Sequence, residues 1–253
     1  MNLKNINQKM ERIQREIIVR MIGREKYISR VIFASQLYRS FLPFKNRTMK
    51  VIRNYILFPG AVVIDVGANI GRFTGLASEL VKRNGQVHSF EPVHMAYRVL
   101  KASVRLKRLR NVSLNPVALS DKNGKAEISV PLVDGWKPKL PVAHMGADPR
   151  ITLKQEIITK KLDDYCRESN ISRVDFIKCD TEGHEYFVLM GELECLLKNK
   201  PTVLCEIYGK YCGRQNVNPS QIFELFYNIG YQSFISTKEG MLLQIKGYKN
   251  PSD

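Results

Sequence analysis

The stretch Val62-Val63-Ile64-Asp65-Val66-Gly67-Ala68-Asn69-Ile70-Gly71 decides the fold of this chain. Its β-branched apolar residues suit a buried parallel strand, and the Gly-x-Asn-x-Gly turn leads into residues 73–82, which are typical of a helix. The two glycines supply backbone angles and a close ligand approach that a Cβ would block. A strand, a tight turn and a helix form the first half of a βαβ unit, so the sequence predicts an α/β fold.

A second apolar run, residues 87–90, ends at Glu91, twenty residues after Gly71. Ligands of open α/β sheets bind beyond the carboxyl ends of the strands. We therefore expect Glu91 to accept hydrogen bonds from the hydroxyls of a ribose. The predicted cofactor-binding residues of this corner are Asp65, Gly67, Asn69, Gly71 and Glu91.

The turn departs from the dinucleotide fingerprint G-x-G-x-x-G, because Asn69 stands where a dehydrogenase has its second glycine. Asp65 also places a negative charge near the position of a pyrophosphate, which disfavours a dinucleotide. S-adenosylmethionine carries a positive sulfur and an ammonium but no phosphate, so an acidic turn suits it. The absence of a G-x-x-x-x-G-K-[ST] run argues against a nucleotide triphosphatase. The sequence thus predicts S-adenosylmethionine as the cofactor.

Four segments together resemble the FkbM family of class I S-adenosylmethionine-dependent methyltransferases, from about residue 60 to the C-terminus. They are residues 65–71 (DVGANIG), 90–92 (FEP), 175–185 (DFIKCDTEGHE) and 203–207 (VLCEI). The acidic run of the third segment, followed about twenty residues later by Glu-Ile, is the most specific of them. The resemblance implies methyl transfer to an oxygen, commonly a hydroxyl of a glycan or another polyhydroxylated acceptor.

The residues that follow the predicted strand 173–179 include several carboxylates and an imidazole, and they lie where such an acceptor would bind. A hydroxyl is hardly ionised at neutral pH, so a base must take its proton as the methyl group is transferred. The catalytic candidates are Asp180, Glu182, His184 and Lys178, the last as a charge partner. Capping of the next helix by Asp180 or Thr181, with Glu182 and Glu185 complementing the helix N-terminus, is the structural alternative. We expect no metal; the alternative is Mg²⁺ held by Asp180, Glu182 and Glu206.

Two further positions concern the edges of the predicted site. Ser120 and Asp121, just past the third strand, are expected to approach the adenine amino group, unless they only form the turn before Lys122. An insertion rich in Pro and Gly follows, flanked by predicted strands at 125–132 and 156–161. Trp136 and His144 lie in it, and we interpret them as a loop plug and a surface histidine rather than as catalytic groups.

Strands and helices alternate as in a Rossmann-like class I methyltransferase fold. We expect a seven-stranded, mostly parallel sheet whose last strand is antiparallel, because residues 231–236 and 241–246 form a hairpin around Gly240. The expected strands are 61–66, 86–91, 112–118, 173–179, 202–207, 231–236 and 241–246. The expected helices are 73–83, 93–109, 184–198 and 219–228.

The formal charge of +16 is uneven along the 253 residues. Residues 1–60 carry thirteen Lys and Arg against three Glu, a net of +10, and their apolar residues recur at helical spacing. We therefore divide the chain into a basic helical N-terminal extension, 1–58, and a methyltransferase domain, 59–253. A second basic cluster lies on the helix expected at 93–109 and just after it, at Arg98, Lys101, Arg105, Lys107, Arg108 and Arg110.

Such charge attracts polyanions, and the mixture of basic and apolar residues favours an anionic membrane surface over nucleic acid. The five cysteines form no C-x-x-C pair, and the N-terminus has no apolar stretch that could cross a bilayer or serve as a secretory signal. We expect a cytoplasmic protein with peripheral membrane contact through its basic segment. The alternatives are an RNA- or protein-directed methyltransferase of the same fold and a non-catalytic membrane-docking module.

Overall fold

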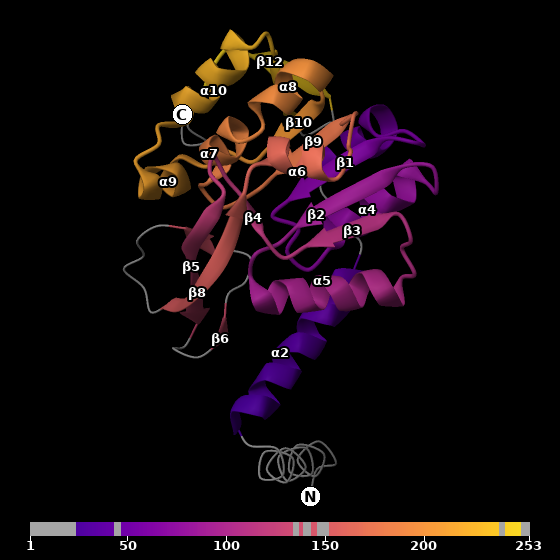
Figure 1. Ribbon diagram of the computed structural model, residues 1–253, viewed down its shortest axis with the longest axis vertical. Helices are drawn as coiled ribbons and strands as arrows, with labels where there is room; N and C mark the ends of the chain where they lie inside the picture. The colour runs from indigo at the N-terminus through magenta and orange to yellow at the C-terminus, as the bar shows by residue number, and fades with distance from the viewer. Residues whose placement is uncertain are drawn as a thin grey trace, which may run out of the picture.

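The centre of the molecule is a parallel β-sheet with helices on both faces (Figure 1). The structure is a computed structural model and describes residues 24–42, 47–133, 137–138, 143–145, 152–237 and 241–248. In these residues the sheet has five strands in the order β10-β9-β1-β2-β3, all parallel. The strands are β1 (Val62–Val66), β2 (Gln86–Phe90), β3 (Val112–Asn115), β9 (Phe176–Cys179) and β10 (Thr202–Cys205).

Adjacent residues of β1 belong to different hydrophobic clusters, because successive side chains of a strand point to opposite faces. Val63 packs with Phe73 and Ala77 of α4 (Arg72–Val81) on one face. Ile64 packs with Leu189 and Leu196 on the other. The helices of this second face include α6 (Leu162–Glu168), α7 (Glu185–Met190), α8 (Leu193–Asn199) and α10 (Pro219–Asn228). Burial on both faces explains why β1 is apolar almost throughout.

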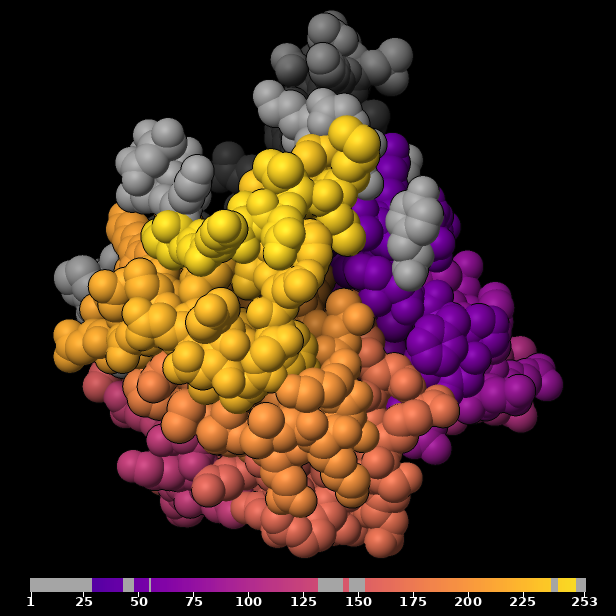
Figure 2. Space-filling view, turned by 90° about the horizontal axis from the view of Figure 1, so that it is seen from above, coloured from indigo at the N-terminus to yellow at the C-terminus, as the bar shows by residue number. Residues whose placement is uncertain are grey.

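The C-terminal hairpin corrects the expected sheet of seven strands. Strands β11 (Ser233–Ser236) and β12 (Leu242–Ile245) pair with each other in antiparallel fashion, as expected, but they form a separate two-stranded sheet in the described residues. The hairpin packs against α3 (Arg47–Val51), where Ser236 Oγ lies 3.1 Å from Thr48 Oγ1. It does not pair with the edge strand β10. Figure 2 shows the C-terminal residues beside the N-terminal ones on this side of the molecule.

The insertion forms a second sheet beside the carboxyl ends of the central strands. It contains β4 (Ala118–Leu119), β5 (Gly124–Val133), β6 (Lys137–Pro138), β7 (His144–Met145) and β8 (Thr152–Lys160). The long pair β5–β8 confirms the strands expected at 125–132 and 156–161. The single strand expected at 112–118 is wrong: Pro116, which lacks an N–H, separates β3 in the first sheet from β4, which pairs with β8 in the second.

The helix expected at 184–198 is also divided, into α7 and α8. Gly191 lies between them with its backbone against the second sheet, since a Cβ there would stand 2.0 Å from the carbonyl oxygen of Ser120. This contact fixes where α7 ends. The helices α6 and α9 (Gly209–Cys212) were not expected from the sequence.

The described part of the N-terminal extension packs against the core. Helix α2 (Arg24–Phe41) contacts α5 (His94–Leu106) through a buried face formed by Ile32, Gln36 and Ser40. The π-helix η1 (Ile52–Ile56) follows α3, and Ile52 belongs to the same cluster as Val63. The boundary at residue 58 stays a prediction, and residues 1–23 and Trp136 lie outside the described residues. No helix of the described ranges is long and apolar enough to cross a membrane.

The core of the second face contains a fully buried acid, Glu192, between α7 and α8. Neither of its carboxylate oxygens has a hydrogen-bond partner among the described residues. Burial raises the pKa of Glu192 well above its usual range, and the neighbouring Cys195 and Asp163 act in the same direction. The folded state therefore holds a proton that the unfolded chain releases above its ordinary pKa of 4.5.

We expect Glu192→Met to stabilise the fold by about 1–3 kcal/mol at pH 8, because an apolar side chain of similar size needs no buried partner. The gain should shrink as the pH falls toward 5, since the unfolded chain then also holds the proton. Urea denaturation at both pH values measures this. The exposed Glu224 of α10 gives the control Glu224→Met. A variant less stable than the parent at pH 8 contradicts the burial penalty.

The turn after β1 gives a second prediction. Gly67 has φ 72°, and a Cβ on it would lie 2.0 Å from the carbonyl oxygen of Asp180. Gly67→Ala should cost about 2 kcal/mol or more, because both the backbone angle and the contact between the ends of β1 and β9 are strained. Gly213, with φ −60° and nothing within 4 Å of its Cβ position, provides the control Gly213→Ala. Equal denaturation midpoints for the two variants would refute the close approach.

Candidate active site

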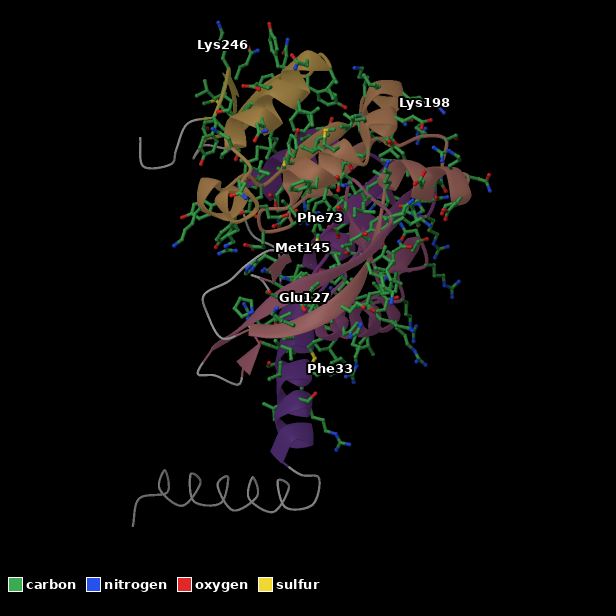
Figure 3. All side chains as sticks on the ribbon, turned by 60° about the vertical axis from the view of Figure 1, so that its left-hand side comes forward. Phe33, Phe73, Glu127, Met145, Lys198 and Lys246 are labelled. Carbon is green, nitrogen blue, oxygen red and sulfur yellow. The ribbon has the colours of Figure 1, made fainter. Side chains whose placement is uncertain are left out.

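A cavity opens where the carboxyl ends of β1, β2, β9 and β10 meet the second sheet. It encloses about 810 Å³ of empty space, its mouth included. The central sheet contributes Gly67, Asn69, Glu91, Asp180, Thr181, Glu182, His184 and Glu206 to its lining, and the second sheet contributes Ile128, His144 and Met145. Figure 3 labels Met145 and Glu127 in the region where the second sheet adjoins the central one. Most of the predicted site residues are thus brought together.

The glycine turn is held by hydrogen bonds to the neighbouring strand. The N–H groups of Gly67 and Ala68 both donate to the carbonyl of Phe90, at 3.1 and 3.0 Å. Asn69 has φ 50°, and its N–H donates to Glu91 Oε2 at 2.7 Å. The side-chain oxygen of Asn69 is buried without a hydrogen-bond partner in the described residues. An unsatisfied acceptor beside the cavity is a position that a ligand donor would satisfy.

Glu91 is buried, and its carboxylate joins two loops. Oε2 accepts from Asn69, and Oε1 accepts from the N–H of Val93 at 2.8 Å. Burial raises the pKa of Glu91 to about 7, although the two N–H donors act in the opposite direction. Each oxygen retains a second lone pair, so the carboxylate is able to accept further hydrogen bonds from a ligand in the cavity.

Asp65 occupies a different position from the one expected. It is fully buried, accepts a hydrogen bond from Thr74 Oγ1 at 2.6 Å, and is not among the described residues that line the cavity. Its other oxygen lies 3.9 Å from Lys178 Nζ. Burial raises the pKa of Asp65, while Lys178 and Thr74 oppose the shift. The expected contact of Asp65 with the cofactor stays a prediction. In the structure the Asp65 carboxylate stabilises the charged form of Lys178.

Lys178 is a buried cation between two acids. Its Nζ donates to Asp180 Oδ2 at 2.9 Å, in addition to its contact with Asp65. Burial alone would lower the pKa of Lys178, but Asp180 and Asp65 raise it, so the ammonium stays charged. The predicted role of Lys178 as a charge partner agrees with this geometry. The ion pair fixes Asp180 at the wall of the cavity.

The loop after β9 is shaped by Glu185 rather than by a capping Asp180 or Thr181. The Glu185 carboxylate accepts from the N–H and hydroxyl of Thr181, at 2.8 and 3.0 Å, and from the N–H of Gly183 at 3.0 Å. Gly183, at φ 108°, touches the Tyr211 backbone, with 2.4 Å between its Cβ position and the Tyr211 carbonyl oxygen. The loop is thereby locked with Glu182 at φ 58°. Glu185 is structural, and Glu182 is left facing the cavity.

Glu182 and Glu206 complete an acidic cluster around Asp180. Burial, followed by Asp180 and Glu206, raises the pKa of Glu182 to about 7, and its Oε2 is buried with no hydrogen-bond partner among the described residues. The pKa of Glu206 is also raised to about 7. The largest cause is the negative charge of Asp180, followed by burial and by a hydrogen bond to Asp180. We had considered Glu206 only as a metal ligand. Its place at the end of β10, next to β9, was the signal that it belongs to the site.

His184 lines the cavity, but both of its ring nitrogens have partners. Nδ1 lies 2.8 Å from Gln215 Oε1, which only accepts, so Nδ1 carries the hydrogen. Burial lowers the pKa of His184, and its Nε2 lies 2.9 Å from Ser120 Oγ, whose hydroxyl donates to Asp121 Oδ1 at 3.1 Å. Nε2 is therefore packed against the Ser120 hydroxyl. Ser120 and Asp121 are not among the described lining residues, and their adenine contact stays a prediction.

His144 differs from the surface histidine that we expected. It is 1% exposed and belongs to the short strand β7, which pairs with β5 and brings it to the cavity. Among the described residues no cluster of three or more His, Cys, Asp or Glu is arranged to hold a metal ion.

Known proteins and one protein family are similar to this chain. The family model of the methyltransferase FkbM domain matches residues 65–233. The 2-O-methyltransferase NoeI of Sinorhizobium fredii is 28% identical over 56% of this chain and 61% of its own length. The 31-O-demethyl-FK506 methyltransferase FkbM of Streptomyces tacrolimicus is 30% identical over 53% of this chain and 60% of its own length.

The chain thus spans about three fifths of the length of these two relatives. A crystal structure of the methyltransferase FkbM from Methylobacillus flagellatus superimposes with a TM-score of 0.47 and 12% identity, covering 84% of this chain and 56% of that one. The family expected from the sequence is confirmed by the match to residues 65–233, and with it S-adenosylmethionine as the cofactor. This chain belongs to the methyltransferase FkbM domain family.

Proposed function

We propose that this protein transfers a methyl group from S-adenosylmethionine to a hydroxyl oxygen of a glycan or another polyhydroxylated acceptor. The observation that carries this proposal is one cavity, in which the glycine turn and Glu91 face the acidic cluster of Asp180, Glu182 and Glu206. Two relatives are named for methylation at oxygen, which supports the choice of atom.

The described residues fit this cofactor on the side of the glycine turn. Glu91 has free lone pairs for ribose hydroxyls, and the unsatisfied Oδ1 of Asn69 is an acceptor for a polar hydrogen. The acidic surroundings favour a ligand with positive charge and no phosphate. S-adenosylmethionine supplies an electrophilic methyl group, and every other requirement falls on the protein.

The acidic cluster supplies the proton acceptor. Glu206 shares a hydrogen bond with Asp180, and its pKa is raised to about 7, a value well matched to a base that acts at neutral pH. Lys178 keeps the Asp180 side of the pair in place. Glu182, with its unpartnered Oε2, positions the acceptor hydroxyl or its neighbour. His184 is the weaker base because its Nε2 is packed against the Ser120 hydroxyl, 2.9 Å away.

The cavity also bears on the alternatives. Its lining carries Glu91, Asp180, Glu182 and Glu206 and, among the described lining residues, no Lys or Arg. A phosphodiester backbone would be repelled there, so RNA is a poorer acceptor than a neutral polyol. A purely non-catalytic module does not explain a base cluster beside a cofactor turn. A cytoplasmic setting stays a prediction, and the five free thiols agree with a reducing compartment.

The first test concerns the acceptor class. Labelled S-adenosylmethionine and purified protein are incubated with cell extract separated into carbohydrate, lipid, nucleic acid and protein fractions. We expect label in the carbohydrate or in small polyhydroxylated metabolites, and none in nucleic acid. Label confined to RNA or to protein would replace the proposal by the corresponding alternative.

The second test concerns the base. At saturating cofactor the rate should rise with pH through about 7 and level off above it, because Glu206 and Glu182 act only when ionised and their pKa values lie at about 7. Glu206→Gln and Asp180→Asn should lower kcat by about 10²–10⁴-fold with little change in cofactor affinity. The exposed Glu79 of α4 gives the control Glu79→Gln. Equal losses of turnover and cofactor affinity would assign the pair a structural role.

The third test concerns Glu91. Glu91→Gln should weaken S-adenosylmethionine binding by about 10–100-fold, the range expected when hydrogen bonds to a charged acceptor are lost. Titration calorimetry measures this, with Glu156→Gln on β8, whose side chain is 71% exposed, as the matched control. Binding of the parent should also weaken below pH 7, since the pKa of Glu91 lies at about 7. Unchanged affinity in the variant would remove Glu91 from the cofactor site.

A further inference from the structure

A surface formed by helices α2 and α5 combines basic and apolar side chains. We name it the α2–α5 surface. Its apolar members are large and exposed: Val31 by 49%, Tyr38 by 69%, Phe41 by 48%, Leu42 by 42% and Leu106 by 60%. Its basic members, all exposed, are Arg30, Arg39, Arg98, Lys101, Arg105 and Arg108.

Helix α2 has one buried side and, opposite it, an exposed side that carries apolar residues. Ile32, Gln36 and Ser40 recur at four-residue intervals and face α5, where they are buried. Val31 and Tyr38, seven residues apart, share an exposed face on the other side, and the exposed Leu42 follows directly after the end of the helix. At 100° per residue, Arg30 and Arg39 fall on the two flanks of this face. Among the described residues, no helix or strand covers Val31 and Tyr38 on this face.

Helix α5 adds a stripe of positive charge. Arg98, Lys101 and Arg105 lie at intervals of three and four residues, opposite the buried residues Ala96, Val99 and Leu100, and the exposed Arg108 follows just after the end of the helix. The sequence of α5 contains no Asp or Glu. Figure 1 shows α2 leaving the domain beneath α5, on the side of α5 that is turned away from the central sheet.

The two helices are joined rigidly enough to act as one surface. Lys107 Nζ donates to the carbonyl of Ser40 at 2.7 Å and lies 4.9 Å from the ring centroid of Phe41. Arg98 lies over the ring of Phe33 at 5.6 Å. The orientation of the exposed face of α2 is therefore fixed relative to the basic stripe of α5.

We propose that the α2–α5 surface binds an anionic lipid bilayer, with α2 lying in the headgroup region. An apolar face flanked by arginines is the arrangement in which aliphatic and aromatic groups enter the acyl boundary while the guanidinium groups reach the phosphates. The stripe on α5 adds the long-range attraction to a negative surface. Nucleic acid would use the positive charge but leaves Val31 and Leu42 without a partner. The helix does not span the bilayer, because none of the helices described is apolar enough.

The test uses the full chain and sedimentation with vesicles. Vesicles of equal parts phosphatidylglycerol and phosphatidylcholine should bind the protein, vesicles of phosphatidylcholine alone should bind it at least about tenfold more weakly, and added salt should weaken the binding. Val31→Ser with Tyr38→Ser should reduce binding by about tenfold or more, and so should Lys101→Glu with Arg105→Glu. Because these side chains are exposed, circular dichroism and S-adenosylmethionine affinity should stay unchanged.

Matched controls come from the opposite end of the molecule. Figure 3 shows Lys198 and Lys246 far from Phe33 of α2. Lys198→Glu and Tyr227→Ser, both at exposed positions of α8 and α10, should leave vesicle binding unchanged. Equal binding to neutral and anionic vesicles, loss of binding in the controls, or a single-stranded RNA oligonucleotide that binds more tightly than anionic vesicles would each overturn the proposal.

Discussion

The site depends on one buried cation. Lys178 has almost no contact with water, and an unpaired ammonium in that position would cost several kcal/mol. It is tolerated because Asp65 and Asp180 flank it from the ends of two neighbouring parallel strands. Asp65 and Lys178 are register partners on β1 and β9, so a slip between these strands would leave the charge without its acids. The same pairing that completes the sheet therefore places the glycine turn beside the acidic loop.

Because Lys178 is engaged by Asp65 and Asp180, the remaining acids of the cavity have little positive charge to stabilise them. Burial and mutual repulsion then raise the pKa values of Glu91, Glu182 and Glu206 to about 7. Carboxyl groups with such pKa values are able to accept and release protons at neutral pH. The ion pairs that stabilise Lys178 within the sheet thus leave the carboxyl groups of the cavity with raised pKa values.

The sequence was sufficient where local patterns and topology agree. The apolar run 62–66, the glycines and Glu91 predict a corner at the end of parallel strands, and the cavity lies there. The features that were missed depend on contacts between distant segments: the close approach of Gly191 to Ser120 divides a helix, and Glu185 folds back over its own loop. The hairpin was recognised, but its docking on α3 rather than on β10 depends on packing that no local pattern encodes. His144 reaches the cavity only because β7 pairs with β5.

The net charge of +16 does not describe the cavity, because positive and negative groups are distributed differently over the protein. The outside is basic, most of all along α2 and α5, whereas the described lining of the cavity is acidic. A polyanion is therefore attracted to the surface of the protein but repelled from the reacting centre. A neutral polyol meets no such barrier and finds several hydrogen-bond acceptors at the end of the sheet. The basic exterior and the acidic cavity consequently favour different partners, a charged surface for the helices and an uncharged acceptor for the carboxylates.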